Sequence, residues 1–85
     1  MRLAEVAQAV GGRLHQATGD ELVTASVEFD SRAVRPGGLF LALPGEHADG
    51  HDFVAAAMAA GAVGTLAGRP VQAPAVVAPA ASASA

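Results

Sequence analysis

The chain has 85 residues, 52% of them hydrophobic, with a formal net charge of −3 and neither cysteine nor lysine. That length allows one small domain, and the missing residue types exclude disulfides, thiolate chemistry, a P-loop with its phosphate-binding lysine, and a basic surface for nucleic acid. No apolar run approaches the ~20 residues of a membrane span, and the lack of cysteine is compatible with the cytoplasm.

An amphipathic helix is predicted at the start of the chain, because apolar side chains recur there at helical spacing. Gly11 and Gly12 follow and are typical of a left-handed helix cap. The alternative is the first helix of a helix-turn-helix, although no basic recognition helix follows. A short strand over residues 13–17 should come next. The apolar positions of the helix are Leu3, Val6, Ala7 and Val10.

Residues 23–30 show the cleanest pattern in the chain, an alternation of apolar and polar side chains that predicts a half-buried strand. One face should be buried and the other solvated. The inward residues are Val23, Ala25, Val27 and Phe29, and the outward residues are Thr24, Ser26, Glu28 and Asp30.

A second strand, a helix and a third strand are predicted after a Pro-Gly turn at residues 35–38. Residues 39–43 are apolar on both faces, as expected of an interior strand. A helix with a buried stripe of Phe53, Val54, Ala57 and Met58 should follow and end at Gly61. Residues 62–67 then complete a βαβ unit.

The expected fold class is therefore α/β, a small mixed sheet with flanking helices. Residues 75–78 add a last short strand, so the domain should span residues 1–78. Residues 79–85 contain only Pro, Ala and Ser, and they are predicted to form a tail or linker.

Two histidines and two carboxylates within six residues invite a metal interpretation, but the spacing does not demand one. Asp49 and Asp52 are explained as a helix N-cap and its partner in a capping box, so no metal site is predicted. Ser31 as a nucleophile is not supported, because no G-x-S-x-G elbow surrounds it. The two histidines and two carboxylates considered as metal ligands are His47, Asp49, His51 and Asp52.

Anion binding is the better interpretation of the segment that follows the first strand. Ser31 offers a hydroxyl and Arg32 a planar set of donors at a strand end. The 45–50 loop adds backbone amides before an electropositive helix start. An ion pair of Arg32 with Asp30 or Glu28 is the equally open alternative.

The motif D-S-R-A-V-R-P-G-G-L-F-L-A-L-P-G, followed by D-G-H-D-F, resembles the N-terminal domain of the Mur ligases. These ATP-dependent enzymes add amino acids or dipeptides to the UDP-N-acetylmuramoyl peptide of bacterial cell wall synthesis. The D-G-H-D-F ending favours the members that add D-alanyl-D-alanine to the tripeptide. Members that add the third residue, and a stand-alone binding module, are the alternatives.

The resemblance implies that this domain holds the UDP end of the UDP-N-acetylmuramoyl-peptide substrate and contains no catalytic residue. ATP and Mg²⁺ would belong to the rest of a cytoplasmic parent enzyme, whose central ATPase and C-terminal ligase domains are the expected partners. The fragment alone should be inactive. The substrate-binding residues carried over by motif are Phe29, Ser31, Arg32, Glu46, His47 and Ala48.

Overall fold

The computed structural model describes residues 1–42 and 50–78. In this part of the chain, strands β1 to β5 form one sheet in the order β1-β5-β4-β3-β2. β1 is antiparallel to β5, and every other neighbouring pair is parallel. The predicted mixed α/β sheet is confirmed. The elements are α1 Leu3–Val10, β1 Arg13–His15, β2 Val27–Glu28, β3 Leu39–Leu41, the 3₁₀ turn η1 Gly50–Phe53, α2 Val54–Ala59, β4 Gly64–Ala67 and β5 Ala75–Val77.

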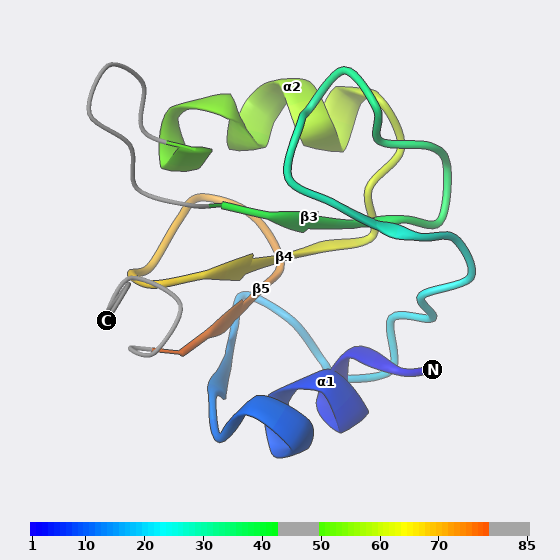
Figure 1. Ribbon diagram of the computed structural model, residues 1–85. Helices are drawn as coiled ribbons and strands as arrows, with labels where there is room; N and C mark the ends of the chain where they lie inside the picture. Colours follow the sequence, from blue (N-terminus) through cyan, green and yellow to red (C-terminus); the bar gives the residue numbers. More distant parts are fainter. Residues whose placement is uncertain (43–49, 79–85) are drawn as a thin grey trace.

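The two helices lie on opposite faces of the sheet, with α2 above it and α1 below it in Figure 1. Successive residues of a strand point to opposite faces, so Leu39 packs on the α1 side of the sheet while Phe40 packs on the α2 side. The α1 layer is built on Leu3, Leu39 and Val76. The α2 layer is built on Phe40 and small side chains, which suits an alanine-rich chain.

Helix α1 forms where the sequence predicts it, and Gly11 ends it in the left-handed conformation at φ 67°. Glu5 Oε1 accepts a hydrogen bond from the Arg2 backbone N–H at 2.8 Å, which satisfies one donor at the helix start. Val10 is exposed, so the buried stripe is one residue shorter than predicted. Strand β1 follows α1, and the helix-turn-helix alternative is therefore wrong.

The strand predicted over residues 23–30 is mostly wrong. Only Val27 and Glu28 pair with a neighbour, and the Val27 side chain is 54% exposed. Phe29, also expected to be buried, is 71% exposed. The reason is the position of β2 at the edge of the sheet. Among the described residues, neither a further strand nor a full helix covers its alternating side chains.

The turn predicted at residues 35–38 forms between β2 and β3. The Gly38 N–H donates to the Arg35 carbonyl at 2.9 Å, with Pro36 and then Gly37 at φ 87° between them, which is a type II turn. Gly37 N–H also donates to the Gly61 carbonyl at 2.9 Å. A side chain at Gly61 would meet the Pro36 Cα at 2.7 Å, so the end of α2 and this turn touch backbone to backbone.

The β3–α2–β4 unit confirms the predicted βαβ arrangement, but its helix begins differently. Phe53 is 43% exposed, and His51 takes the buried place instead at 8%. A 3₁₀ turn has about three residues per turn, which aligns His51 with Val54 and Ala57. Asp49, and with it the predicted cap pairing with Asp52, lies outside the described residues, as does the predicted 79–85 tail.

Candidate functional site

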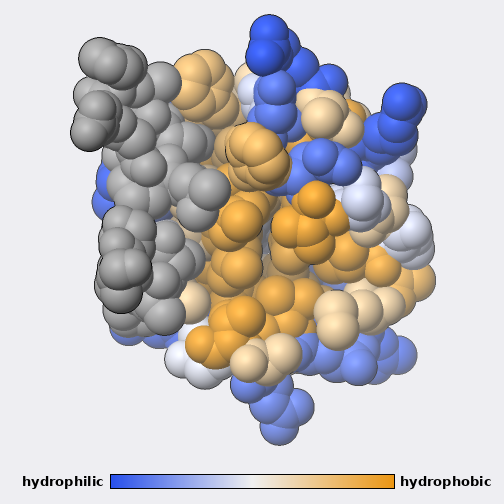
Figure 2. Space-filling view, in the orientation of Figure 1, coloured by the Kyte–Doolittle hydropathy of each residue, from blue (hydrophilic) through white to orange (hydrophobic). Residues whose placement is uncertain are grey.

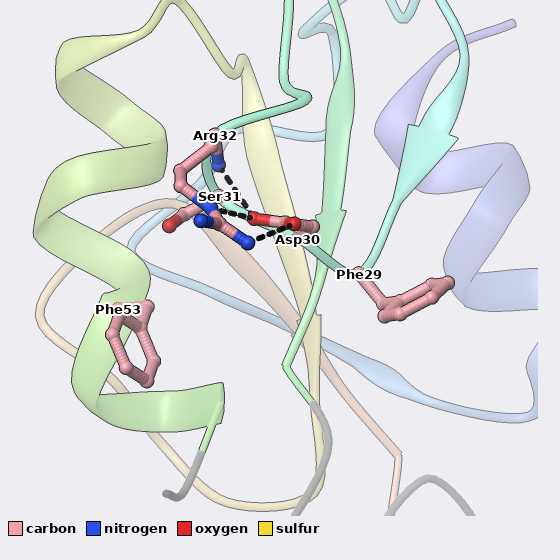
Figure 3. A pocket seen from close by; sticks show the side chains of 5 residues that line it. All are labelled: Phe29, Asp30, Ser31, Arg32 and Phe53. Carbon is pink, nitrogen blue, oxygen red and sulfur yellow. Dashed lines mark hydrogen bonds and ion pairs between the residues drawn. The ribbon is translucent and has the colours of Figure 1, made fainter.

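The candidate site lies at one edge of the sheet. β2, β3 and β4 are parallel, so their carboxyl ends meet at the same edge, where α/β proteins place ligands. Residues 29–32 follow β2 there, and η1 opens the helix that follows β3. Together they enclose a pocket of about 390 Å³, shown in Figure 3. Its described lining residues are Phe29, Asp30, Ser31, Arg32 and Phe53.

A bidentate ion pair between Arg32 and Asp30 lies among the lining residues of the pocket. Arg32 Nε donates to Asp30 Oδ1 at 3.1 Å, and Nη2 donates to Oδ2 at 3.0 Å. The Arg32 backbone N–H also donates to Asp30 Oδ1 at 2.9 Å, which ties the carboxylate to its own turn. The Arg32 side chain hydrogen bonds hold the pKa of Asp30 below its ordinary value. The ion-pair alternative for Arg32 is thus present in the structure.

This ion pair leaves Arg32 able to bind an anion. Its side chain is 89% exposed, and among the described residues the guanidinium bonds use only Nε and Nη2. Arginine has five N–H donors in one plane, so Nη1 remains for a ligand. The Asp30 carboxylate holds the guanidinium in one orientation, which lowers the entropy that a ligand would otherwise have to remove.

Ser31 stands at the corner of the same turn, closed by the Ala33 N–H donating to the Asp30 carbonyl at 2.9 Å. The turn exposes its hydroxyl to the pocket. None of the described lining residues is a histidine that could activate it. The hydroxyl is therefore suited to donating or accepting a hydrogen bond.

Two aromatic rings border the pocket from different elements. Phe53 enters from η1, whereas the Phe29 ring points away from Arg32 on the other side, as Figure 3 shows. The space-filling view in Figure 2 shows hydrophobic residues across the middle of the face between the two helical layers. An exposed aromatic side chain at a pocket offers a flat apolar surface to a planar ligand.

The structure brings together Phe29, Ser31 and Arg32 of the predicted site residues. Glu46, His47 and Ala48 lie outside the described residues. Phe53 was missed as a lining residue because its spacing resembled that of a buried stripe. The signal that could have found it is topological: a helix that follows one parallel strand begins beside the end of the next strand.

Metal-ligating side chains do not gather in the described part of the chain, where no group of three or more His, Cys, Asp or Glu is close enough to hold an ion. His47 and Asp49 of the considered cluster lie outside it. Over residues 1–42 and 50–78, no helix has the length and apolar character to cross a membrane.

Comparison with protein families identifies the chain's relatives. The model described as "Mur ligase family, catalytic domain" matches residues 24–85, which include every described lining residue of the pocket. A UDP-N-acetylmuramoyl-tripeptide–D-alanyl-D-alanine ligase of Mycobacterium leprae is 58% identical over 81 residues, 91% of this chain and 16% of the relative. The enzyme of that name from Mycobacterium tuberculosis H37Rv is 54% identical over 83 residues, 93% of this chain and 16% of the relative.

Other relatives extend the comparison to a second reaction and to solved structures. A UDP-N-acetylmuramoyl-L-alanyl-D-glutamate–2,6-diaminopimelate ligase of Prochlorococcus marinus is 44% identical over 68 residues, 79% of this chain and 13% of the relative. A crystal structure of MurF from Acinetobacter baumannii superposes with a TM-score of 0.78 at 31% identity, over 89% of this chain and 17% of that one. The chain thus spans about 16% of the length of the first relatives. It belongs to the Mur ligase family, and its fold is that of a MurF-type N-terminal domain.

Proposed function

We propose that this chain is the substrate-holding domain of an ATP-dependent ligase that adds D-alanyl-D-alanine to UDP-N-acetylmuramoyl-tripeptide in peptidoglycan synthesis. Its pocket takes the UDP end of that substrate. The observation that carries the proposal is the pocket itself, which combines two aromatic rings, a hydroxyl and an oriented guanidinium at the carboxyl edge of parallel strands.

Each group of the pocket suits one part of a uridine diphosphate. Phe29 and Phe53 offer surfaces on which a uracil ring can stack. The Arg32 guanidinium, with Nη1 available among the described contacts, suits a diphosphate oxygen. Ser31 can hydrogen-bond a ribose hydroxyl or a uracil edge. Backbone groups of Glu46, His47 and Ala48 complete this site by analogy with the family.

The share of this domain in the reaction is binding energy rather than chemistry. Holding the nucleotide fixes the far end of the substrate, so that its reacting carboxylate is positioned in the rest of the enzyme. The chain's own residues do not fit ATP or Mg²⁺, because no lysine or P-loop is present and the described residues form no carboxylate cluster. ATP and Mg²⁺ are assigned to the missing domains of a cytoplasmic parent, and the fragment alone is inactive.

A ligase that adds the third residue is the second candidate, supported by the 44% identity to a diaminopimelate ligase. The identity of 58% to a D-alanyl-D-alanine ligase favours the first candidate. Assaying the full-length parent with each amine in turn separates them. Amide formation with diaminopimelate, and none with D-alanyl-D-alanine, would overturn the first assignment.

Calorimetric titration of the 85-residue chain with UDP-N-acetylmuramoyl-tripeptide tests the binding role. We expect weak binding that falls by roughly tenfold in Arg32→Ala, the equivalent of about 1.4 kcal/mol. Arg13→Ala is the matched control, because Arg13 is also exposed but belongs to β1 at the opposite edge of the sheet. Equal heats for the native chain and Arg32→Ala contradict the site, and turnover with ATP contradicts the inactivity of the fragment.

A further inference from the structure

His51 is a buried histidine that the proposed binding role does not use directly. It lies in η1 with 8% of its surface exposed. Its Nε2 accepts a hydrogen bond from the Gly68 backbone N–H at 3.2 Å. Gly68 follows β4, so this bond joins the start of the α2 helix to the loop that leaves the neighbouring strand.

The 3₁₀ geometry couples His51 to the pocket. With about three residues per turn, side chains two positions apart point in clearly different directions. His51 therefore points into the protein beneath η1, while Phe53 points outward and lines the pocket. A turn of four residues has little freedom to move one of these side chains without the other.

The bond also defines the role of the imidazole. A ring nitrogen that accepts a hydrogen bond uses its lone pair to do so, so Nε2 acts here as an acceptor. Removing the ring would leave the part-buried Gly68 N–H without this acceptor. An acceptor of the right reach at position 51 is the feature that the geometry requires.

We propose that His51 is a positioning residue: by anchoring η1 to Gly68 it sets the place of the Phe53 ring, and so the affinity of the pocket for the nucleotide end of the substrate. This inference rests on the proposed function, because it concerns the same pocket. It adds a residue that touches no ligand but acts through one that does.

A double-mutant cycle separates this role from a general loss of stability. UDP-N-acetylmuramoyl-tripeptide binding is measured well below the unfolding temperature for the native chain, His51→Ala, Phe53→Ala and the double variant. We expect a roughly tenfold loss for Phe53→Ala and a threefold to tenfold loss for His51→Ala. In the Phe53→Ala background His51→Ala should cost no further affinity, because residues that act as a unit are not additive.

His51→Gln is the conservative variant, since a glutamine side-chain oxygen can reach the position of Nε2. It should restore most of the affinity and return the Gly68 amide NMR signal toward its native position. The proposal is overturned if His51→Ala lowers the affinity equally in the native chain and in Phe53→Ala. It is also overturned if His51→Gln restores neither the affinity nor the Gly68 amide signal.

A ligand-free measurement keeps this inference distinct from the proposed function. The ring signals of ¹³C-labelled Phe53 should move toward those of a mobile, solvated phenylalanine in His51→Ala and stay near native in His51→Gln. Unchanged ring signals in His51→Ala refute the positioning role even if the native chain binds substrate. Absence of binding by the native chain refutes the proposed function, whatever the ring signals show.

Discussion

The two edges of the sheet differ in how completely they are covered. At the β1 edge, α1 packs on the sheet with its Leu3 in the same apolar cluster as Val76 of β5. Gly12 lets the backbone approach within contact of β5. At the β2 edge only two residues pair, and Val27 and Phe29 remain exposed. The packed edge contributes stability and the open edge leaves side chains free for a ligand. The four predictions below test these edges and the centre of the sheet between them.

The largest effect is expected at the packed edge, from Leu3→Ala. Leu3 is fully buried in the α1 layer, so its removal leaves a cavity that costs about 2–5 kcal/mol. Urea unfolding of both chains measures this loss. Val10→Ala on the same helix is the control, because Val10 is exposed and should cost far less. Similar losses for the two variants would mean that α1 does not pack as described.

Gly12→Ala should be the next most damaging change at that edge. Its Cβ would lie 2.7 Å from Val76 Cγ1 and 2.9 Å from the Val77 carbonyl oxygen, so β5 would have to shift. We expect a cost of about 1–3 kcal/mol, read as a lower midpoint in thermal unfolding. A native midpoint in Gly12→Ala would show that the backbone at Gly12 and β5 are less tightly packed than the structure indicates.

Much of the fold could be predicted from the sequence, because local chemistry decides it. Gly11 ends α1 and the Pro36-Gly37 pair sets the type II turn, whatever surrounds them. The half-buried strand predicted over residues 23–30 is mostly wrong, because alternating side chains indicate an extended segment but not which elements cover it. β2 lies at the edge of the sheet. The prediction that Phe53 is buried is wrong because a 3₁₀ turn has about three residues per turn, whereas a helical stripe assumes about 3.6.

The candidate site was predicted only in part, for a related reason. Ser31 and Arg32 are predicted because polar residues at a strand end are visible in sequence, and the structure places both at the pocket. Sequence alone leaves the choice between an ion pair and an anion site open, because Asp30 and Arg32, two residues apart, suit both. The structure shows the ion pair together with an exposed guanidinium, so the two alternatives are compatible.

Thr65→Val tests the centre of the sheet, between the two edges. The Thr65 side chain is fully buried on β4, and its hydroxyl has no hydrogen-bond partner among the described residues. An unsatisfied buried hydroxyl is costly, so the isosteric valine should stabilise the fold by about 1 kcal/mol. Thr65→Ser, which keeps the hydroxyl and loses the methyl, should destabilise it. Lower stability of Thr65→Val would indicate a partner for the hydroxyl.

The smallest effect is expected from acid. The pKa of Asp30 lies below its ordinary 3.8 because of Arg32, and the pKa of Glu21 lies below 4.5 because of its own backbone N–H and those of Thr18 and Gly19. A carboxyl with a depressed folded pKa stabilises the fold above its unfolded pKa, and this contribution is lost as pH falls through the folded value. The contribution of these two carboxyls should therefore be complete above about pH 4.5 and decline below it, which urea unfolding at a series of pH values measures.

Carboxyl NMR titration checks this assignment residue by residue. Arg32→Ala should raise the pKa of Asp30 toward its ordinary value and leave Glu21 unchanged, because Arg32 lowers the pKa of Asp30 and is not among the causes of the Glu21 shift. A shift of both carboxyls would point to a change in the whole fold, and a shift of neither would mean that the ion pair does not form in solution.

The position of β5 has a consequence for synthesis of the chain. β5 is the last strand among the described residues, yet it lies between β1 and β4, and Val76 belongs to the same apolar cluster as Leu3. A growing chain therefore presents α1 and β1 to the cell before their partner strand has left the ribosome. Until residues 75–77 emerge, the α1 layer lacks the strand that carries Val76, so this half of the described fold can become native only after they have been translated.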